Sequence, residues 1–400
     1  MSWKTICIGD LGKVITGNTP PKKDPEFYGV DYKFIKPTDM DIDARYTHIT
    51  EDHYSLKAYE KYKKSLIPPL STCVVTIGSI GKKITLTDDN SFVNQAVNAV
   101  IPKTDEYDPF FVFYALKNLL PNVKKADTGA SSGRENVSKS NFMSLPLNVP
   151  NSLTKQKRIG LVLSSFDDLI ENNLKRIKLL EQAAQNIYKE WFVKLRFPGY
   201  ENTPIIEETG LPEGWEKQSA FNLFDIKGGT QPPKPEWADD LKEGYVRMVQ
   251  IRDYKTDSHI AYVKDTQKLR RCDRQDVMIA RYGASVGRIC WGLKGAYNVA
   301  LVKVVPYDNA YLEYIRWYVK SYYFQESLVS MTQRAAQDGF NKDTFKSLDA
   351  IIPAIKVVND FHNMVYPMLK QMELLKNKNQ KLKAARDILL PRLMNRTIEV

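Results

Sequence analysis

Two short pairs of an acid and a lysine have the spacing in this chain that most resembles a catalytic motif. Asp31 stands two residues before Lys33, and Asp253 stands two residues before Lys255. A carboxylate can bind a divalent metal ion and a nearby lysine can stabilise developing negative charge, as a metal-dependent nuclease requires. A nuclease that uses Asp31 and Lys33 is therefore one hypothesis to carry forward.

Further catalytic and metal-binding signatures are missing from the sequence. The four cysteines form no Cys-x-x-Cys motif and the four histidines lack metal-ligand spacing, so we expect no bound metal. The sequence also has no Gly-x-x-x-x-Gly-Lys-Ser/Thr phosphate loop. It has no Asn/Asp-Pro-Pro-aromatic segment of the kind with which a methyltransferase holds its target amine. We expect a protein that is not an enzyme and uses no cofactor.

Basic residues beside glycine turns suggest a different chemistry, the binding of a polyanion. The chain has a net charge of +11, and most of this excess lies in residues 151–200 and 355–400. Because the other parts are close to balanced, nucleic-acid binding would depend on local basic patches rather than on bulk charge. These patches are Lys22-Lys23, Lys82-Lys83, Ser132-Gly133-Arg134, Arg270-Arg271, Arg281-Tyr282-Gly283, Arg288 and Arg334.

Much of the chain is a repeat, in which residues 3–153 are echoed by residues 215–355. Gly17 and Pro20-Pro21-Lys22 recur as Gly229 and Pro232-Pro233-Lys234. Other pairs follow in the same order: Phe34-Ile35 with Met248-Val249, Asp39 with Asp253, Gly78–Lys82 with Gly283–Arg288, Asn94 with Asn298, Pro102 with Pro306, and Phe142 with Phe345. A period this long indicates a domain duplication. The two acid–lysine pairs do not fall at equivalent points, so we interpret them as coincidental.

Each copy is followed by a long helical pattern. Apolar residues step by alternating threes and fours over Ile159–Trp191 and over Phe361–Leu393. A mean spacing of about 3.5 residues is the signature of a coiled coil. If the two helices pack antiparallel, with the end of the first beside the start of the second, Asn173 faces Asn379. A buried Asn pair would fix the register of the helices, because any slip buries an unpaired amide.

Within each copy, short β-rich runs bounded by Gly, Asn and Pro alternate with aromatic-rich helical segments. We predict an α+β fold class, with two repeated α+β domains joined by two long helices that form an antiparallel coiled coil. The predicted boundaries are 1–150 for the first domain, 151–200 for the first long helix, 201–354 for the second domain and 355–400 for the second long helix. With no 18-residue apolar run and no leader pattern, we expect a cytoplasmic chain that is neither secreted nor membrane-spanning.

Several motifs resemble one protein family. They are the segment Leu211–Trp215 that opens the second copy, the Gly-x-Thr/Gln-Pro-Pro turns at 17–21 and 229–233, and Trp191–Gly199 at the end of the first helix. Together with Gln156 at the start of that helix, they make the chain similar to the specificity (S) subunit of type I restriction–modification systems. The resemblance covers the whole chain. The second copy departs from it, because no such Gln and no Trp-Phe-Val tail accompany its helix.

The resemblance implies a DNA-binding, non-catalytic subunit of a restriction and DNA modification complex. Each copy would be a target recognition domain that reads one half of a bipartite site in double-stranded DNA. The helix pair would act as a spacer and as the docking site for two methyltransferase (modification) subunits, and motor-nuclease (restriction) subunits would join that core. Loop side chains would contact bases and phosphates. The candidates are Thr19, Lys22, Ser79, Lys82, Lys83, Arg134 and Asn136, then Gln231, Lys234, Arg281, Ser285, Arg288, Arg334 and Gln337.

Two alternatives remain beside this hypothesis. One is the metal-dependent nuclease described above, and the other is a coiled-coil scaffold protein without DNA specificity. The duplicated basic, glycine-flanked loops favour DNA recognition over the scaffold.

Overall fold

The computed structural model describes residues 3–127, 135–255, 259–334 and 339–399, apart from the side chains of residues 284, 333 and 334. The chain forms two compact units. Unit 1 comprises Met1–Leu174 and Asn377–Val400, and unit 2 comprises Lys175–Lys376. Each unit therefore includes parts of both long helices, so the units divide the chain inside the helices and not at their ends. In the described part of the chain, no helix has the length and apolar character needed to cross a membrane.

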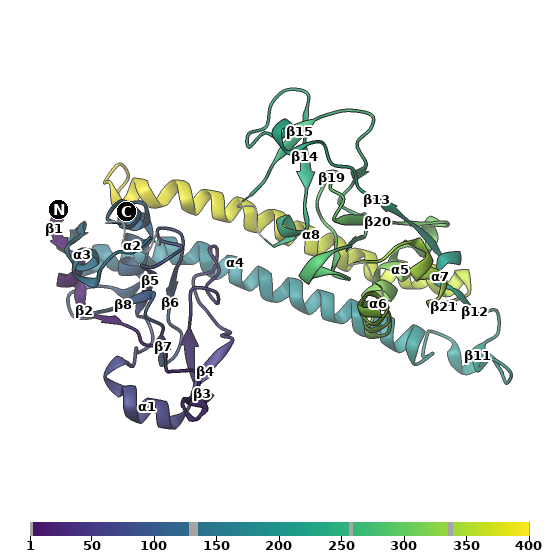
Figure 1. The fold of residues 1–400 in the computed structure, drawn as a ribbon, viewed down its shortest axis with the longest axis horizontal. Helices are drawn as coiled ribbons and strands as arrows, with labels where there is room; N and C mark the ends of the chain where they lie inside the picture. The colour runs from purple at the N-terminus through teal and green to yellow at the C-terminus, as the bar shows by residue number, and fades with distance from the viewer. Residues whose placement is uncertain (1–2, 128–134, 256–258, 335–338, 400) are drawn as a thin grey trace. The chain divides into compact units, whose positions relative to one another are not determined.

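Unit 1 contains an antiparallel four-stranded sheet, a smaller mixed sheet and a strand pair (Figure 1). The four-stranded sheet has the order β2 (Gly12–Thr16), β8 (Val97–Pro102), β5 (Thr72–Val75) and β6 (Ile84–Leu86). The mixed sheet has the order β4 (Asp52–Tyr54), β3 (Tyr28–Ile35) and β7 (Ser91–Val93), and the pair is β1 (Trp3–Cys7) with β9 (Pro146–Pro150).

Unit 2 repeats this arrangement. Its four-stranded sheet has the order β13 (Phe224–Gly228), β20 (Leu301–Pro306), β17 (Met278–Ala280) and β18 (Ile289–Cys290). A second sheet has the order β15 (Tyr262–Lys264), β14 (Tyr245–Val249), β19 (Gly295–Tyr297) and β16 (Arg271–Cys272). The two strand pairs are β12 (Glu216–Ser219) with β21 (Asp349–Ile352), and β10 (Ile205–Ile206) with β11 (Leu211–Pro212).

The backbone hydrogen bonds reproduce the equivalences read from the sequence. Strands β2 and β8 pair Gly12 with Pro102, while β13 and β20 pair Phe224 with Pro306. Just beyond these strands, Gly17 and Gly229 each donate their amide to the first residue of the partner strand. Because antiparallel register is set by such pairings, the two units are copies of one α+β design.

The helices of unit 1 are α1 (Leu56–Tyr62), α2 (Pro109–Lys125) and α3 (Lys139–Ser144), and those of unit 2 are α5 (Leu312–Val319), α6 (Tyr322–Arg334) and α7 (Lys342–Lys346). Helix α2 begins at Pro109, and the Asp108 carboxylate accepts a hydrogen bond of 2.9 Å from the Phe111 amide. This N-cap satisfies an amide that has no partner inside the helix. Phe111, Phe113 and Leu116 of α2 then pack into the core of unit 1.

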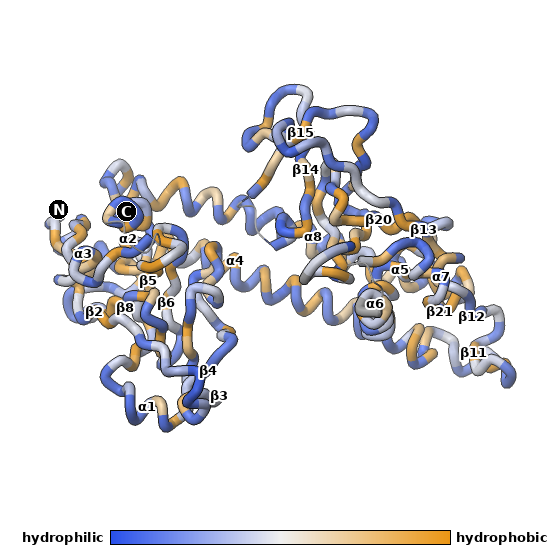
Figure 2. The backbone as a smooth tube through the Cα atoms, in the orientation of Figure 1, coloured by the Kyte–Doolittle hydropathy of each residue, from blue (hydrophilic) through white to orange (hydrophobic). Residues whose placement is uncertain are grey.

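The two long helices are α4 (Leu153–Tyr188), which a π-helical turn continues to Val193, and α8 (Ile355–Met394). Apolar and polar residues alternate along both (Figure 2), as expected of helices that bury one stripe. In unit 1, Ile159 and Leu163 of α4 share a core with Leu390 and Leu393 of α8. In unit 2, the rings of Trp191 and Phe361 lie 5.8 Å apart, centroid to centroid.

Candidate nucleic-acid interface

Four loop segments of unit 1 meet at one edge of its four-stranded sheet. They are residues 17–19 after β2, 76–83 between β5 and β6, 94–96 before β8, and 135–137. The Thr76 amide donates to the Ala96 carbonyl at 2.8 Å, the Val137 amide donates to Thr76 at 2.9 Å, and the Gly78 amide donates to Glu135 at 3.0 Å. These bonds hold the segments together as the loop cluster of unit 1.

Polar side chains fill the centre of this loop cluster. The Thr16 hydroxyl donates to Asn98 Oδ1 at 2.5 Å, and Asn98 Nδ2 donates to the Thr76 hydroxyl at 2.9 Å. Asn98 and Thr76 are buried. At the surface, the Thr19 hydroxyl donates to the Gln95 side chain. The sequence pointed to Thr19 but missed Asn98 and Gln95, which lie far from it along the chain.

The predicted basic residues of unit 1 differ in how free they are to contact DNA. Lys22 and Lys82 are exposed, whereas Lys83 is half-buried and its ammonium donates to the Pro37 carbonyl at 2.6 Å. Ser79 is half-buried, and the Asn136 backbone amide donates to the Asp127 carboxylate at 2.9 Å. Asn136 and Ser79 belong to neighbouring segments of the loop cluster. Arg134 lies outside the described residues.

The loop cluster of unit 2 has the same construction from residues 229–231, 281–288, 298–300 and 339–341. The Thr230 amide donates to the Tyr297 carbonyl at 3.1 Å, and the Arg281 amide donates to the Ala300 carbonyl at 2.8 Å. Arg281 Nε also donates to the Phe340 carbonyl at 2.9 Å. This side-chain bond joins two segments that a backbone bond joins in unit 1.

Gln231 and Lys234 lie on the exposed turn that follows β13. The Lys234 ammonium sits 4.0 Å from the centroid of the Trp237 ring, and the Trp237 indole donates to the Pro232 carbonyl at 3.0 Å. This turn carries the same backbone hydrogen bond as the equivalent turn of unit 1. Lys234 therefore occupies the position in unit 2 that Lys22 occupies in unit 1. The cation–π contact orients Lys234 without removing its charge.

Ser285 is half-buried and Arg288 is exposed, and both lie between β17 and β18. The Ala280 amide donates to the Arg288 carbonyl, and the Val75 amide donates to the Lys83 carbonyl. Lys83, and not Lys82, therefore occupies the position of Arg288, which corrects the alignment of the two basic loops. The side chain of Arg334 and all of Gln337 lie outside the described residues.

Gly17 and Gly229 allow two segments of each loop cluster to come into contact. A Cβ at Gly17 would lie 1.8 Å from the Val93 carbonyl oxygen, and one at Gly229 would lie 2.1 Å from the Asn298 carbonyl oxygen. A real side chain cannot occupy either position without backbone movement. The two glycines are thus required by close backbone approach and not by a turn.

The acid–lysine pairs have structural partners of their own. Lys33 forms an ion pair of 2.6 Å with Asp88 and not with Asp31. Although burial raises the pKa of Asp88, hydrogen bonds from Lys33 and His48 hold it below its ordinary value. The Asp253 carboxylate accepts the Gln250 amide at 3.1 Å and so closes a local turn. Among the described residues, no group of acids, histidines and cysteines is arranged to hold a metal ion.

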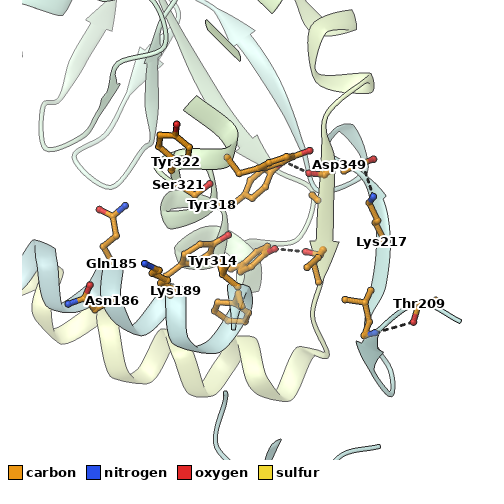
Figure 3. A pocket seen from close by; sticks show the side chains of 17 residues that line it. Gln185, Asn186, Lys189, Thr209, Lys217, Tyr314, Tyr318, Ser321, Tyr322 and Asp349 are labelled. Carbon is orange, nitrogen blue, oxygen red and sulfur yellow. Dashed lines mark hydrogen bonds and ion pairs between the residues drawn. The ribbon is translucent and has the colours of Figure 1, made fainter. Parts of the chain in front are cut away.

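A cavity of about 900 Å³ in unit 2 lies beside the end of α4, α5 and β21 (Figure 3). The hydroxyls of Tyr314 and Tyr318 donate to the carbonyls of Ile351 and Asp349 at 2.5 and 2.7 Å. Because these hydroxyls are engaged, the rings present mainly apolar surface to the cavity. No candidate DNA-binding residue lines it, so it is separate from the loop cluster of unit 2.

Comparison with known proteins shows which class this chain is similar to. Residues 1–182 match the family model of the type I restriction modification DNA specificity domain. The chain is 23% identical over 407 residues to the type I restriction enzyme MjaIX specificity subunit of Methanocaldococcus jannaschii, which covers 98% of this chain and 92% of that protein. It is 32% identical over 182 residues to the type I restriction enzyme HindI specificity subunit of Haemophilus influenzae, over 45% of this chain and 39% of that protein.

A solved structure shares the fold along the whole chain. It is the type I restriction–modification system S subunit from M. genitalium, with a TM-score of 0.58, 16% identity, and coverage of 98% of this chain and 96% of that one. The chain is therefore similar to the specificity subunits of type I restriction–modification systems, which confirms the resemblance seen in its motifs.

Proposed function

We propose that this chain is the DNA-recognition subunit of a type I restriction–modification complex and that each loop cluster reads one half of a bipartite site. The observation that carries the proposal is the pair of loop clusters built on one backbone design but lined by different side chains. A common scaffold with different loop residues is what two domains need if they bind the same polymer at different sequences. The recognition domains correspond to residues 1–150 and 201–354.

The candidate contacts divide by their surroundings. Exposed Lys22, Lys82, Lys234 and Arg288 suit phosphate or guanine contacts, since a free cationic side chain can reach either. Thr19, Ser79, Asn136, Gln231 and Ser285 supply neutral donors and acceptors that suit base edges. Lys83, held by a carbonyl, is the weakest candidate of the set.

The helical regions 151–200 and 355–400 form an antiparallel coiled coil in this proposal. Asn173 Nδ2 donates to Asn379 Oδ1 at 2.8 Å, and Asn379 Nδ2 donates to the Ile170 carbonyl at 3.3 Å. Both amides are buried, so a slip along the helices would leave them unpaired. A helix of 36 residues is roughly 50 Å long, and its length would set the gap between the half-sites.

The same helices would dock two methyltransferase subunits, and restriction subunits would join through them. The chain itself would carry no catalytic activity and would need no cofactor. The acid–lysine pairs support this view, because Lys33 forms an ion pair with Asp88 and Asp253 closes a local turn. No observation favours the nuclease or the scaffold as a second function.

Selection from a random duplex library tests the proposal. The full-length chain should enrich a bipartite motif with a fixed gap, and the DNA should remain intact when magnesium is added. Failure to enrich any motif would favour a scaffold. Cleavage that disappears on Asp31→Ala would favour a nuclease.

A further inference from the structure

The two loop clusters differ at one set of equivalent positions. In unit 1, Thr16, Asn98 and Thr76 fill the space beside the end of β2 with a chain of hydrogen bonds. Asn98 is 2% exposed and Thr76 is 1% exposed. In this polar trio each side chain is already bonded to another.

In unit 2 the same positions hold Gly228, Val302 and Arg281. Gly228 pairs with Val302 across β13 and β20, as Thr16 pairs with Asn98 across β2 and β8. Arg281 has the backbone hydrogen bond that corresponds to that of Thr76. Two side chains of the trio are thus replaced by a hydrogen atom and an apolar group, and the third is replaced by an arginine.

The replacement opens a notch of about 330 Å³ in unit 2, lined by Ile226, Gly228, Arg281, Val302, Asn341, Lys342 and Asp343. A Cβ at Gly228 would lie 3.9 Å from Arg281 Nη1, so the guanidinium borders the space that a side chain would fill. Arg281 Nε is bonded to the Phe340 carbonyl, and the guanidinium carbon lies 5.0 Å from the centroid of the Tyr282 ring. These contacts fix its orientation.

The other charged side chains around the notch form ion pairs, so Arg281 is the cation that can contact an anionic ligand there. Lys342 forms an ion pair of 2.6 Å with Asp225, and Asp343 forms one of 2.7 Å with Lys346. Burial by itself raises the pKa of Asp225, but the Lys342 hydrogen bond holds it below its ordinary value. Both carboxylates are therefore already paired with a lysine. In the described part of the chain, no carboxylate pairs with Arg281.

A guanidinium in this position suits a phosphate better than a base. Base edges lie at the floor of a major groove about 8.5 Å deep, so a side chain must project to read them. Arg281 is half-buried and tethered at Nε, whereas phosphates protrude from the duplex. We propose that the Arg281 notch binds one backbone phosphate of the DNA and so positions unit 2 on its half-site, a contact that unit 1 does not make. The inference rests on the proposed function.

Removing the charge is the first test, made with the full chain on random-sequence duplex and on its selected site. Arg281→Gln should weaken binding to both by a similar factor, roughly tenfold for one charge-assisted hydrogen bond. The slope of log K against log salt should fall by about 0.9, the value for one phosphate. The selected motif should stay the same. A motif that relaxes at one base pair would show base reading and overturn the proposal.

Filling the notch is the second test, because it leaves Arg281 in place. Gly228→Thr restores the residue type of unit 1 at a strand position with room for a side chain, and should reproduce the loss seen with Arg281→Gln. The matched control is Lys217→Gln, which removes an exposed charge of unit 2 on β12. This variant should bind DNA with the affinity of the wild-type chain. A Gly228→Thr chain that binds as wild type would overturn the proposal, and an unchanged thermal melt excludes misfolding.

Methylphosphonate substitution locates the phosphate. Replacing one backbone phosphate of the selected site with a neutral methylphosphonate should weaken DNA binding by the wild-type chain but not by Arg281→Gln. If no position discriminates the two chains, the proposal is wrong. Stabilisation by inorganic phosphate that requires Arg281, without any effect of Arg281→Gln on DNA affinity, would assign the notch to a free anion and also overturn it. A chain that binds no duplex at all would remove the proposed function as well.

Discussion

The two units hold α4 and α8 by different kinds of contact. In unit 1, the Asp167 carboxylate accepts from the Tyr114 hydroxyl at 2.5 Å and pairs with the buried Arg386 guanidinium. In unit 2, Phe361 packs against Phe192 and Trp191, with ring centroids 4.9 and 5.8 Å apart. Polar bonds are directional and therefore specify register, whereas aromatic burial supplies stability with less dependence on register. The polar contacts in unit 1 therefore specify the register of α4 and α8, and the aromatic contacts in unit 2 stabilise their packing.

Breaking the polar contact should have the largest effect on stability. Asp167→Ala removes one partner of Arg386, which is 2% exposed, but Asp387 still pairs with it at 2.8 Å. We expect a loss of about 3 kcal/mol, the lower end of the range for breaking a buried ion pair. Chemical denaturation, followed by exposure of the Cys73 thiol in unit 1, measures it.

Matched variants sharpen this result. Glu60→Ala removes a surface ion pair of 3.8 Å with Lys63 and should leave the denaturation midpoint unchanged. Asp167→Leu combined with Arg386→Met and Tyr114→Phe should recover most of the loss, because no unpaired polar group remains. If Asp167→Ala behaves like Glu60→Ala, the polar contact does not stabilise unit 1.

A smaller effect tests whether the two loop clusters share one construction. Gly17→Ala and Gly229→Ala both force a methyl group against a carbonyl oxygen and should each destabilise their unit by about 1–3 kcal/mol. The neighbouring Gly228→Ala meets only the Arg281 side chain at 3.9 Å and should be neutral or slightly stabilising in a strand. Equal melting temperatures for Gly228→Ala and Gly229→Ala would contradict the equivalence of the clusters.

The smallest expected difference concerns the thiols. Burial raises the pKa of Cys73 to about 12 and those of Cys272 and Cys290 to about 11, while Cys7 is exposed. Since the thiolate is the reactive form, iodoacetamide at pH 8 should label Cys7 alone in the folded chain. A raised thiol pKa gives stability that is present below pH 9 and lost as the pH rises toward the folded value. Unit 2, with two such thiols, should lose stability more steeply than unit 1 between pH 9 and about 11. Rapid native labelling of Cys272 would contradict its burial.

The sequence predicted the elements that depend on local pattern. The long helices follow from apolar spacing, and the facing of Asn173 and Asn379 follows from extending that spacing through both. Gly17 and Gly229 were found as equivalent positions of the repeat, and close backbone approach is the physical reason that both copies have glycine there. The α+β class followed from short β-rich runs between helical segments.

Features that depend on residues far apart in the chain were not predictable. The hydrogen bonds of Asn98 with Thr16 and Thr76 require the sheet register, which one sequence does not supply. Lys82 and Lys83 are adjacent, so only the backbone pairing shows that Lys83 matches Arg288. The notch beside Arg281 arises from the absence of a side chain at Gly228, a feature that leaves no pattern in the sequence.

The most direct measurement of the central claim exchanges one unit's recognition residues. Residues 1–150 are replaced by the corresponding segment of another family member, and the hybrid chain selects its site from a random duplex library. If each domain reads its half independently, one half of the motif should change while the other half and the gap remain as in the parent. A hybrid that folds, with its buried thiols protected, yet selects a motif altered in both halves would contradict the account.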